Sequence, residues 1–496
     1  MPQSIMVTGW GQVTQPKQAT PPYMDPLDMM ERAARDAAAQ AGVNVLASVD
    51  TLLVVRAQSR VLRAPGEELA RRLGIHPRRI EVSGIGGQVP QHFVNRAAGM
   101  LARGEAGTVL VVGAETFYPR SADAVRGEQA LIQGIPEDYA EEDAVGSNGL
   151  EQRHGLSLPI HGFPLFEVAL WARSGLSREQ WLARVGDMWA GFSAVAARHP
   201  NAWTRAPLTA DAITTPAADN RPICLPYTKR MVSLVMADIG AAVILTTAER
   251  GAAARDGAGQ PVYFLGGGYA KDRQRFMVQK SVFTRSPALE QAAAKAQARA
   301  GLRAAELECF DLYSCFPCAV TVAREHLGLG DGDPRPLTLT GGLGFFGGPG
   351  SNYALHGIAT MAETLASGRY RNGMTTALGW FMHKYAVGIY GSKPNGADLS
   401  GCDVEDENNP EAGAAPVTIA EQVKGAGTLE TYTVIYDRDQ QPNRALLYGR
   451  TAAGLRFVAN TRGDAASFAA LIENNLVGSA VQLHHDGHVN IAELNI

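Results

Sequence analysis

In the first part of the chain, segments with the apolar pattern of strands alternate with segments that have the pattern of helices. Strand-like apolar runs lie at 5–9, 51–55, 81–87 and 108–113. Ala-rich helices are expected from about Pro26 to Gly42, and from Pro90 to Gly104. Continuous apolar runs such as 109–112 are typical of strands that helices cover on both faces, and they predict mostly parallel sheets.

The same order of elements returns after Pro261, so the chain contains an internal repeat. Strand-like runs lie at 262–265, 308–313, 337–350 and 374–379. Ala- or Gly-rich helices are expected at 287–301 and from Pro349 to about Gly368. The repeat predicts an α/β protein built from two similar halves. Helices made of such small residues can approach other backbone closely, which suits a helix packed between two sheets.

Two further regions have patterns of their own. The segment 117–235 is rich in Pro, Gly and Trp and is expected to be an insertion that caps one half. The acidic stretch from Asp403 to Glu411 predicts a linker, and the short strands beyond it predict a small β-barrel or sandwich. The expected limits are 1–116 plus 236–260 for the N-terminal half, 117–235 for the inserted domain, 261–400 for the C-terminal half, 401–415 for the linker and 416–496 for a C-terminal β-rich domain.

Composition narrows the classes of function. The chain has 496 residues, and 45 Lys and Arg against 49 Asp and Glu leave a net charge of −4, so we expect no nucleic-acid partner. The N-terminus lacks the pattern of a signal peptide and no segment is apolar enough for a membrane span. Five cysteines without a framework spacing predict free thiols and a cytoplasmic location.

A glycine motif, Gly342 to Gly347, matches the G-x-G-x-x-G pattern of dinucleotide sites. The acidic residue that such sites need about 20 residues further on is missing, because no Asp or Glu occurs between Glu363 and Asp398. The motif therefore indicates a close backbone approach rather than nicotinamide binding. A glycine loop that opens a helix can direct N–H groups at an oxyanion.

Two other clusters carry candidate chemistry. Cys315 and Cys318 form a C-x-x-C motif at the expected start of a helix, where the helix dipole favours thiolate. The motif is compatible with a redox pair, with two buried thiols, or with a single reactive thiol at Cys315. The histidines of 484–488 flank an Asp-Gly turn signal, so we expect a hairpin there and no metal site.

Four segments resemble the thiolase superfamily, whose members make or cleave carbon–carbon bonds beside a CoA thioester. They are AAGMLARGEAGTVLVVGAE at 97–115, DIGAAVIL at 238–245, DLYSCFPCAV at 311–320 and TGGLGFFGGPGSNYALHGIATM at 340–361. The resemblance covers Ser4 to Gly391. It implies a duplicated thiolase fold with αβαβα layers, an inserted loop domain and a small C-terminal β-barrel-like domain. The trailing region resembles the extra domain of bacterial thiolase-like proteins of the acetyl-CoA acetyltransferase kind, which implies lipid metabolism.

The chain departs from the family at three catalytic motifs. The family's nucleophilic Cys would lie near Gly87 and Gln88, and the run from Gly86 to Pro90 contains no Cys, Ser or Thr. The oxyanion-hole His of the Gly-His-Pro motif is replaced by Gly348. The late Cys-x-Gly motif falls at 377–379 and lacks its Cys. Without a nucleophile, ordinary acyl transfer through an acyl-enzyme has no first step.

One catalytic motif is partly retained. The sterol-carrier type of thiolase has a His-Asp-Cys-Phe motif, which aligns with 313–316 and implies that Cys315 is the acid/base cysteine. Tyr313 replaces the His of that motif. We expect Cys315 or Tyr313 to move a proton at the carbon alpha to a thioester, or to release a β-hydroxyl in a retro-aldol cleavage. Backbone N–H groups at Gly347, Gly348 and Gly350 would hold the enolate.

Three functions remain open at this point. The protein is an acyltransferase or carbon–carbon lyase with a reorganised site, a non-catalytic acyl-CoA-binding protein, or a redox protein using Cys315 and Cys318. The first two require an acyl-CoA ligand and no cofactor beyond the CoA thioester itself. They leave room for a small acyl-CoA-handling partner protein, and for either a monomer or a homodimer.

Overall fold

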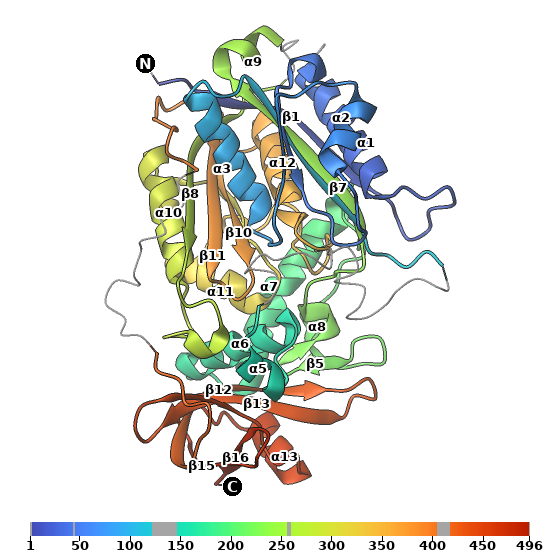
Figure 1. Ribbon diagram of the computed structural model, residues 1–496. Coiled ribbons are helices and arrows are strands. Elements are labelled where there is room, and N and C mark those ends of the chain that lie inside the picture. The colour runs from blue at the N-terminus through green and yellow to red at the C-terminus, as the bar shows by residue number, and fades with distance from the viewer. Residues whose placement is uncertain (1, 43–44, 122–145, 255–258, 404–416, 496) are drawn as a thin grey trace.

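The computed structural model describes residues 2–42, 45–121, 146–254, 259–403 and 417–495, and nine of its strands join in the order β3-β2-β4-β7-β1-β8-β11-β10-β9 (Figure 1). The strands are β1 Ile5–Thr14, β2 Thr51–Val55, β3 Arg79–Val82, β4 Thr108–Thr116, β7 Asp238–Thr247, β8 Tyr263–Lys271, β9 Cys309–Asp311, β10 Asn372–Gly379 and β11 Lys384–Gly391. A short pairing of β1 with β8, Ile5 with Phe264 and Met6 with Tyr263, connects an N-terminal half to a C-terminal half.

Helices form three layers around these two halves of the sheet. The helices of this region are α1 Pro26–Ala41, α2 Pro65–Leu73, α3 Val89–Ala102, α9 Ala248–Ala254, α10 Pro287–Ala300, α11 Pro317–His326 and α12 Tyr353–Ala366. Helices α3 and α12 contact each other and strands of both halves, so they form the middle layer (Figure 1). Helix α1 covers the N-terminal half and α10 the C-terminal half. This arrangement confirms the duplicated fold with αβαβα layers.

The outer helices lie directly on glycines of the strands beneath them, and the same device occurs in both halves. A Cβ on Gly9 of β1 would lie 2.1 Å from the carbonyl oxygen of Ala37 in α1. A Cβ on Gly268 of β8 would lie 2.0 Å from that of Ala292 in α10. Only glycine allows such an approach of helix to strand. The Gly- and Ala-rich repeat in the sequence therefore reflects the packing of a helix on a strand, which occurs once in each half.

The expectation of mostly parallel sheets was wrong. β2 runs parallel to β3 and β4, and β9 runs parallel to β10. The remaining pairs of the nine-stranded path are antiparallel, including β1 with β7 and β10 with β11. Continuous apolar strands report burial on both faces, which both directions allow, so they do not determine the direction of pairing.

The strand expected within 337–350 is also absent, because these residues, all described, form turns and bends. In its place the carbonyl groups of Pro336 and Leu337 accept hydrogen bonds from Phe310 and Leu312. These bonds cover the outer side of β9. The glycine-rich sequence that follows keeps the segment from continuing as a regular strand.

The region between the halves and the end of the chain share one further sheet. The first supplies α5 Gly149–His154, α6 Pro159–Ser174, α7 Arg178–Arg198, α8 Ala210–Thr214, β5 Pro222–Cys224 and β6 Tyr227–Thr228. The second supplies β12 Gly425–Tyr436, β13 Pro442–Thr451, β14 Arg456–Ala459, α13 Ala465–Glu473, β15 Ala480–His485 and β16 Asn490–Leu494. Cys224 of β5 pairs with Ile435 of β12, so a hairpin from the insertion extends the C-terminal sheet.

The C-terminal sheet closes on itself. Its strands follow the order β14-β13-β12-β15-β16. Beyond β14, Asn460 donates its N–H to Asn490 and accepts from the N–H of Ala492, which connects the two ends. The barrel-like form is thereby confirmed, and so is the hairpin at Asp486 and Gly487. Most of the linker expected at 401–415 lies outside the described residues, and the domain limits stay a prediction.

Candidate functional site

Tyr313 and Cys315 lie in the loop between β9 and α11. Pro317 is the first residue of α11 and Phe316 its N-cap, so Cys315 precedes the helix while Cys318 is its second residue. Tyr313 is 6% exposed and Cys315 is 7% exposed. The backbone N–H of Tyr313 donates to Thr376 Oγ1 of β10 at 2.9 Å, which fixes this loop against the end of the sheet.

The start of α3 meets this loop at Gly87. A Cβ on Gly87 would lie 2.1 Å from the Tyr313 hydroxyl and 2.5 Å from the carbonyl oxygen of Leu378. The hydroxyl therefore occupies the volume that a side chain at residue 87 would need. The structure thus brings together Gly87, Tyr313 and the 377–379 segment, three places that the sequence had singled out separately.

Gln88, the other residue at the former nucleophile position, turns its amide oxygen toward two glycines. Its Oε1 would lie 2.2 Å from a Cβ on Gly86 and 2.1 Å from a Cβ on Gly379. Gln88 is 5% exposed, and no described residue donates a hydrogen bond to this oxygen. His92, one turn further along α3, packs against Tyr269 with the ring centroids 4.2 Å apart, and no described residue forms a hydrogen bond with its Nδ1.

The thiol of Cys315 does not have the low pKa that the helix dipole predicted. Burial raises its pKa far above the usual range, although the backbone N–H groups of Phe316 and Cys315 act in the opposite direction. Burial, and then Cys315, also raise the pKa of Tyr313. Both groups are therefore neutral at physiological pH. The predicted thiolate character of Cys315 is wrong, because the loss of hydration outweighs the helix terminus.

The acidic group that lies at the N-terminus of α11 is the buried carboxyl group of Glu167 in α6, and not a thiolate of Cys315. Glu167 accepts hydrogen bonds from Trp181 Nε1 at 2.9 Å, from the Tyr227 hydroxyl at 2.5 Å and from the backbone N–H of Cys318. Burial raises its pKa to about 7 against the effect of these donors. The ring of Phe316 stacks on Phe163 at 4.3 Å. These contacts pack the start of α11, beside Cys315, against α6.

The glycine loop lies against other groups. The Gly348 N–H donates to the Leu234 carbonyl at 2.9 Å, and a Cβ on Gly350 would lie 2.1 Å from Glu115 Oε1. The Ser351 hydroxyl accepts from the Gly86 N–H at 2.9 Å, so the end of the loop reaches the start of α3. The Gly348 N–H is thus already engaged, and the enolate-holding role of Gly347, Gly348 and Gly350 stays a prediction.

Two buried acidic residues escaped the sequence analysis. Glu115 is fully buried at the end of β4 and accepts from the N–H groups of Gln58 and Ser59, and burial raises its pKa to about 7. The feature of the sequence that could have revealed Glu115 is an ionisable residue near the end of an apolar strand. Glu167 had a similar signal, since it is a charged residue within a largely apolar helix.

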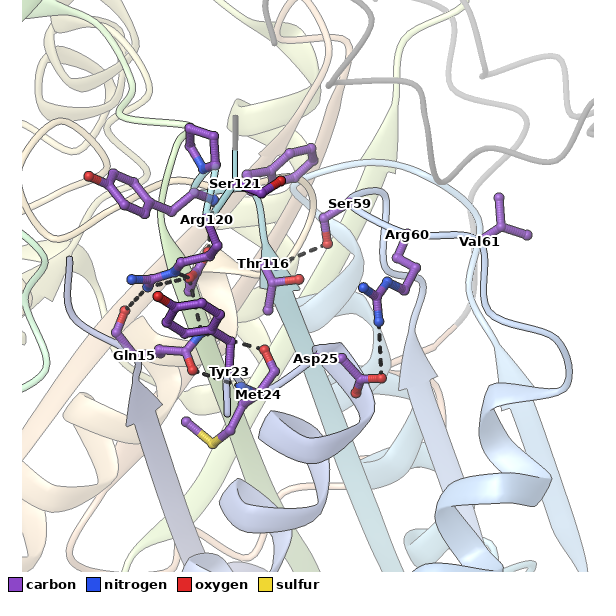
Figure 2. A pocket seen from close by; sticks show the side chains of 14 residues that line it. Gln15, Tyr23, Met24, Asp25, Ser59, Arg60, Val61, Thr116, Arg120 and Ser121 are labelled. Atoms are coloured by element: carbon purple, nitrogen blue, oxygen red, sulfur yellow. Dashed lines mark hydrogen bonds and ion pairs between the residues drawn. The ribbon is translucent and has the colours of Figure 1, made fainter. Parts of the chain in front are cut away.

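Three pockets lie elsewhere on the molecule. One, of about 450 Å³, contains Arg120 between Tyr23 and Tyr118, with Asp25 and Arg60 paired at its rim (Figure 2). The Arg120 guanidinium donates to buried Asp238 and to backbone carbonyl groups, so it serves as a wall of the pocket. The other two pockets have volumes of about 400 and 650 Å³. Neither Tyr313 nor Cys315 lines any of the three.

Two further observations concern metals and membranes. Within the described ranges, no group of three or more His, Cys, Asp or Glu side chains could hold a metal ion. Of the helices that the structure describes, none has the length and apolarity needed to cross a membrane. All five cysteines are free thiols, as the sequence predicted, and the structure buries all of them.

Comparisons with known proteins agree with this fold. The family model "Thiolase-like protein type 1 additional C-terminal domain" matches residues 411–488. The crystal structure of a monomeric SCP2-thiolase like protein type 1 from Mycobacterium smegmatis is 29% identical, with a TM-score of 0.83 over 100% of this chain and 99% of that one. A search of curated proteins found no match.

Two more distant structures share the fold alone. An Ltp2–ChsH2(DUF35) aldolase is 20% identical, with a TM-score of 0.62 over 80% of this chain and 98% of that one. Human mitochondrial 3-ketoacyl-CoA thiolase in complex with CoA is 15% identical, with a TM-score of 0.54 over 79% of this chain and 98% of that one. From the fold, the C-terminal match and the full-length neighbour together, the chain belongs to the thiolase superfamily.

Proposed function

We propose that the protein is a carbon–carbon bond lyase that acts on acyl-CoA thioesters without forming an acyl-enzyme. Its reaction is the retro-aldol cleavage of the bond between the α and β carbons of a β-hydroxyacyl thioester. One observation carries the proposal: the Tyr313 hydroxyl fills the volume at Gly87 where an acylated side chain would have to stand. The aldolase among the structural neighbours has the same fold and the same class of reaction in its name.

The chemistry needs one proton to move from the β-hydroxyl oxygen to the α carbon. As the carbon–carbon bond breaks, the hydroxyl carbon becomes a carbonyl and the thioester becomes an enolate, which takes up a proton at the α carbon. Tyr313 and Cys315 are both neutral, since burial raises both pKa values. A neutral hydroxyl or thiol transfers both protons in one step: it gives its own proton to the α carbon and takes up the hydroxyl proton on the same atom, so it is neutral again at the end.

The enolate oxygen needs hydrogen-bond donors. The N–H groups of Gly87 and Gln88 stand at the N-terminus of α3, and no described residue accepts a hydrogen bond from either. A helix N-terminus favours negative charge through its dipole and its free N–H groups. We assign the enolate oxygen to these two groups, with the loop at Gly347 to Gly350 as the facing wall.

A second function, acyl-CoA binding without chemistry, also has an observation in its favour. Tyr313 and Cys315 are almost fully buried, and burial raises the pKa of both, so neither supplies a phenolate or thiolate base at physiological pH. In either case we propose an acyl-CoA ligand, a cytoplasmic location and a small acyl-CoA-handling partner protein. A monomer is the assembly that the Mycobacterium smegmatis neighbour's description favours.

The experiment measures covalent labelling and turnover together. After incubation with acetyl-CoA, intact mass spectrometry should show no added acetyl group. With 3-hydroxyacyl-CoA substrates, the protein should release a shorter acyl-CoA, and Tyr313→Phe should lower the rate at least about 100-fold. Tyr23→Phe, at an exposed tyrosine, is the control. A stoichiometric adduct within 86–90, or full turnover by Tyr313→Phe, contradicts the proposal, and binding without turnover favours the second function.

A further inference from the structure

Helix α3 and its N-cap residue Gln88 carry two pairs of polar side chains, each four residues apart. In the pair Gln91 and Asn95, Gln91 Nε2 donates to Asn95 Oδ1 at 2.9 Å. Gln91 Oε1 accepts from Thr375 and Tyr390, and Asn95 Nδ2 donates to the Gly268 carbonyl. Every polar atom of this pair therefore has a partner, as is usual for buried polar groups.

The second pair, Gln88 and His92, has no such partners. Gln88 Oε1 and His92 Nδ1 are buried, and neither forms a hydrogen bond with any described residue. Burial, and then Arg96, lower the pKa of His92 to about 4, so its ring is neutral at physiological pH. Buried polar groups without partners are few in native structures, and each calls for an explanation, such as a catalytic role or a bound group that completes it. Two such atoms, one helical turn apart on the same helix face, therefore indicate a place for a ligand.

Gln88 Oε1 lies at the proposed reaction site. It is buried beside Gly86 and Gly379, and Gln88 follows Gly87, where the Tyr313 hydroxyl lies. An amide oxygen only accepts hydrogen bonds. The thioester carbonyl and an unsubstituted or keto-bearing acyl chain offer no O–H or N–H group close to the reacting carbons. A hydroxyl group on the acyl chain does offer one.

We infer that Gln88 is a specificity-determining residue, whose side-chain oxygen accepts a hydrogen bond from a hydroxyl group on the acyl part of the thioester. This inference rests on the proposed function, and it goes further by stating how the site selects hydroxylated acyl groups over plain ones. A plain acyl chain would leave the Gln88 oxygen buried and without a donor. A site built to hydrogen-bond a hydroxyl rejects an analogue that lacks it.

The test compares two ligands on three proteins. The full-length protein, Gln88→Leu and Gln88→Glu are titrated with 3-hydroxybutyryl-CoA and with butyryl-CoA by isothermal calorimetry. The full-length protein should bind the hydroxylated thioester at least about tenfold more tightly. Gln88→Leu removes the acceptor, so the preference should fall to about twofold or less. Gln88→Glu keeps an acceptor oxygen and should retain most of the preference. Gln18→Leu, at an exposed glutamine, controls for the substitution itself.

Two results overturn the inference and leave the proposed function standing. One is equal binding of both thioesters by the full-length protein, and the other is a preference that survives in Gln88→Leu. If neither thioester binds, the proposed function fails together with the inference. Loss of folding does not confuse the outcome, because Gln88 Oε1 makes no hydrogen bond that Gln88→Leu could break.

Discussion

The two polar pairs at α3 differ in whether other residues of the protein supply their hydrogen-bond partners. Gln91 and Asn95 connect the helix to β10, β11 and β8 through hydrogen bonds inside the protein. Gln88 and His92 lie one turn closer to the N-terminus of the same helix, and Gln88 lies beside Gly379 at the end of β10. Fully satisfied buried polar networks stabilise a fold, whereas unsatisfied ones weaken it. We conclude that the first pair serves structure and the second serves the ligand.

The largest effect is expected for Gln91→Leu. This substitution leaves the buried hydroxyls of Thr375 and Tyr390 and the side-chain oxygen of Asn95 without their partner. The free energy of unfolding should fall by about 3 kcal/mol, because each unsatisfied buried group costs about 1–3 kcal/mol. Urea unfolding followed by circular dichroism measures it. Gln88→Leu, the matched variant, should change stability by less than about 0.5 kcal/mol, and equal losses would remove the distinction between the pairs.

A smaller effect is expected where Tyr313 closes the end of α3. In Gly87→Ala, the new methyl group meets the Tyr313 hydroxyl and the Leu378 carbonyl, so the protein should lose about 2 kcal/mol of stability. Gly191→Ala in α7 is the control, because nothing lies within 4 Å of its added Cβ. That variant should be neutral or more stable by up to about 1 kcal/mol. A fully stable Gly87→Ala protein would show that a side chain fits beside Tyr313.

The same contrast occurs between two buried tyrosines of β11. The Tyr390 hydroxyl donates to Gln91 at 2.9 Å, whereas the Tyr385 hydroxyl has no hydrogen-bond partner among the described residues. Tyr390→Phe should lower the free energy of unfolding by about 1 kcal/mol, and Tyr385→Phe should leave it unchanged or raise it slightly. Thermal unfolding of the two variants side by side checks this. The reverse order would refute the hydrogen-bond assignment.

The smallest effect at neutral pH is expected for His92→Gln, and it grows only on acidification. The pKa of His92 is about 4 in the folded protein and near 6.5 in the unfolded chain. The stability that it contributes is therefore present above about pH 6.5 and is lost as the pH falls toward 4. His92→Gln should show a shallower loss of stability between these values. The loss of stability caused by Gln91→Leu should not depend on pH, because neither Gln91 nor Asn95 titrates. A wild-type slope in His92→Gln would contradict the assignment.

Much of the fold could be predicted because it rests on local patterns. The repeated Gly- and Ala-rich segments reflect helices that touch strands at Gly9 and Gly268, and each contact requires a small residue in its own short segment. The absence of a nucleophile between Gly86 and Pro90 was likewise visible in the letters themselves. The direction of pairing between strands and the joining of β5 to β12 were not, because they depend on how distant segments connect.

For the site, too, local features could be predicted from the sequence and contacts between distant segments could not. The sequence by itself determined which side chains are available: Tyr313 and Cys315 in one short loop, and glycines where the family has catalytic residues. Only the tertiary structure decided that the Tyr313 hydroxyl fills the space at Gly87, that burial makes Cys315 a neutral thiol, and that Gln91 is satisfied while Gln88 is not. The reason is physical. Hydration and hydrogen-bond partners come from residues far away in the chain, so two identical glutamines on one helix acquire different roles.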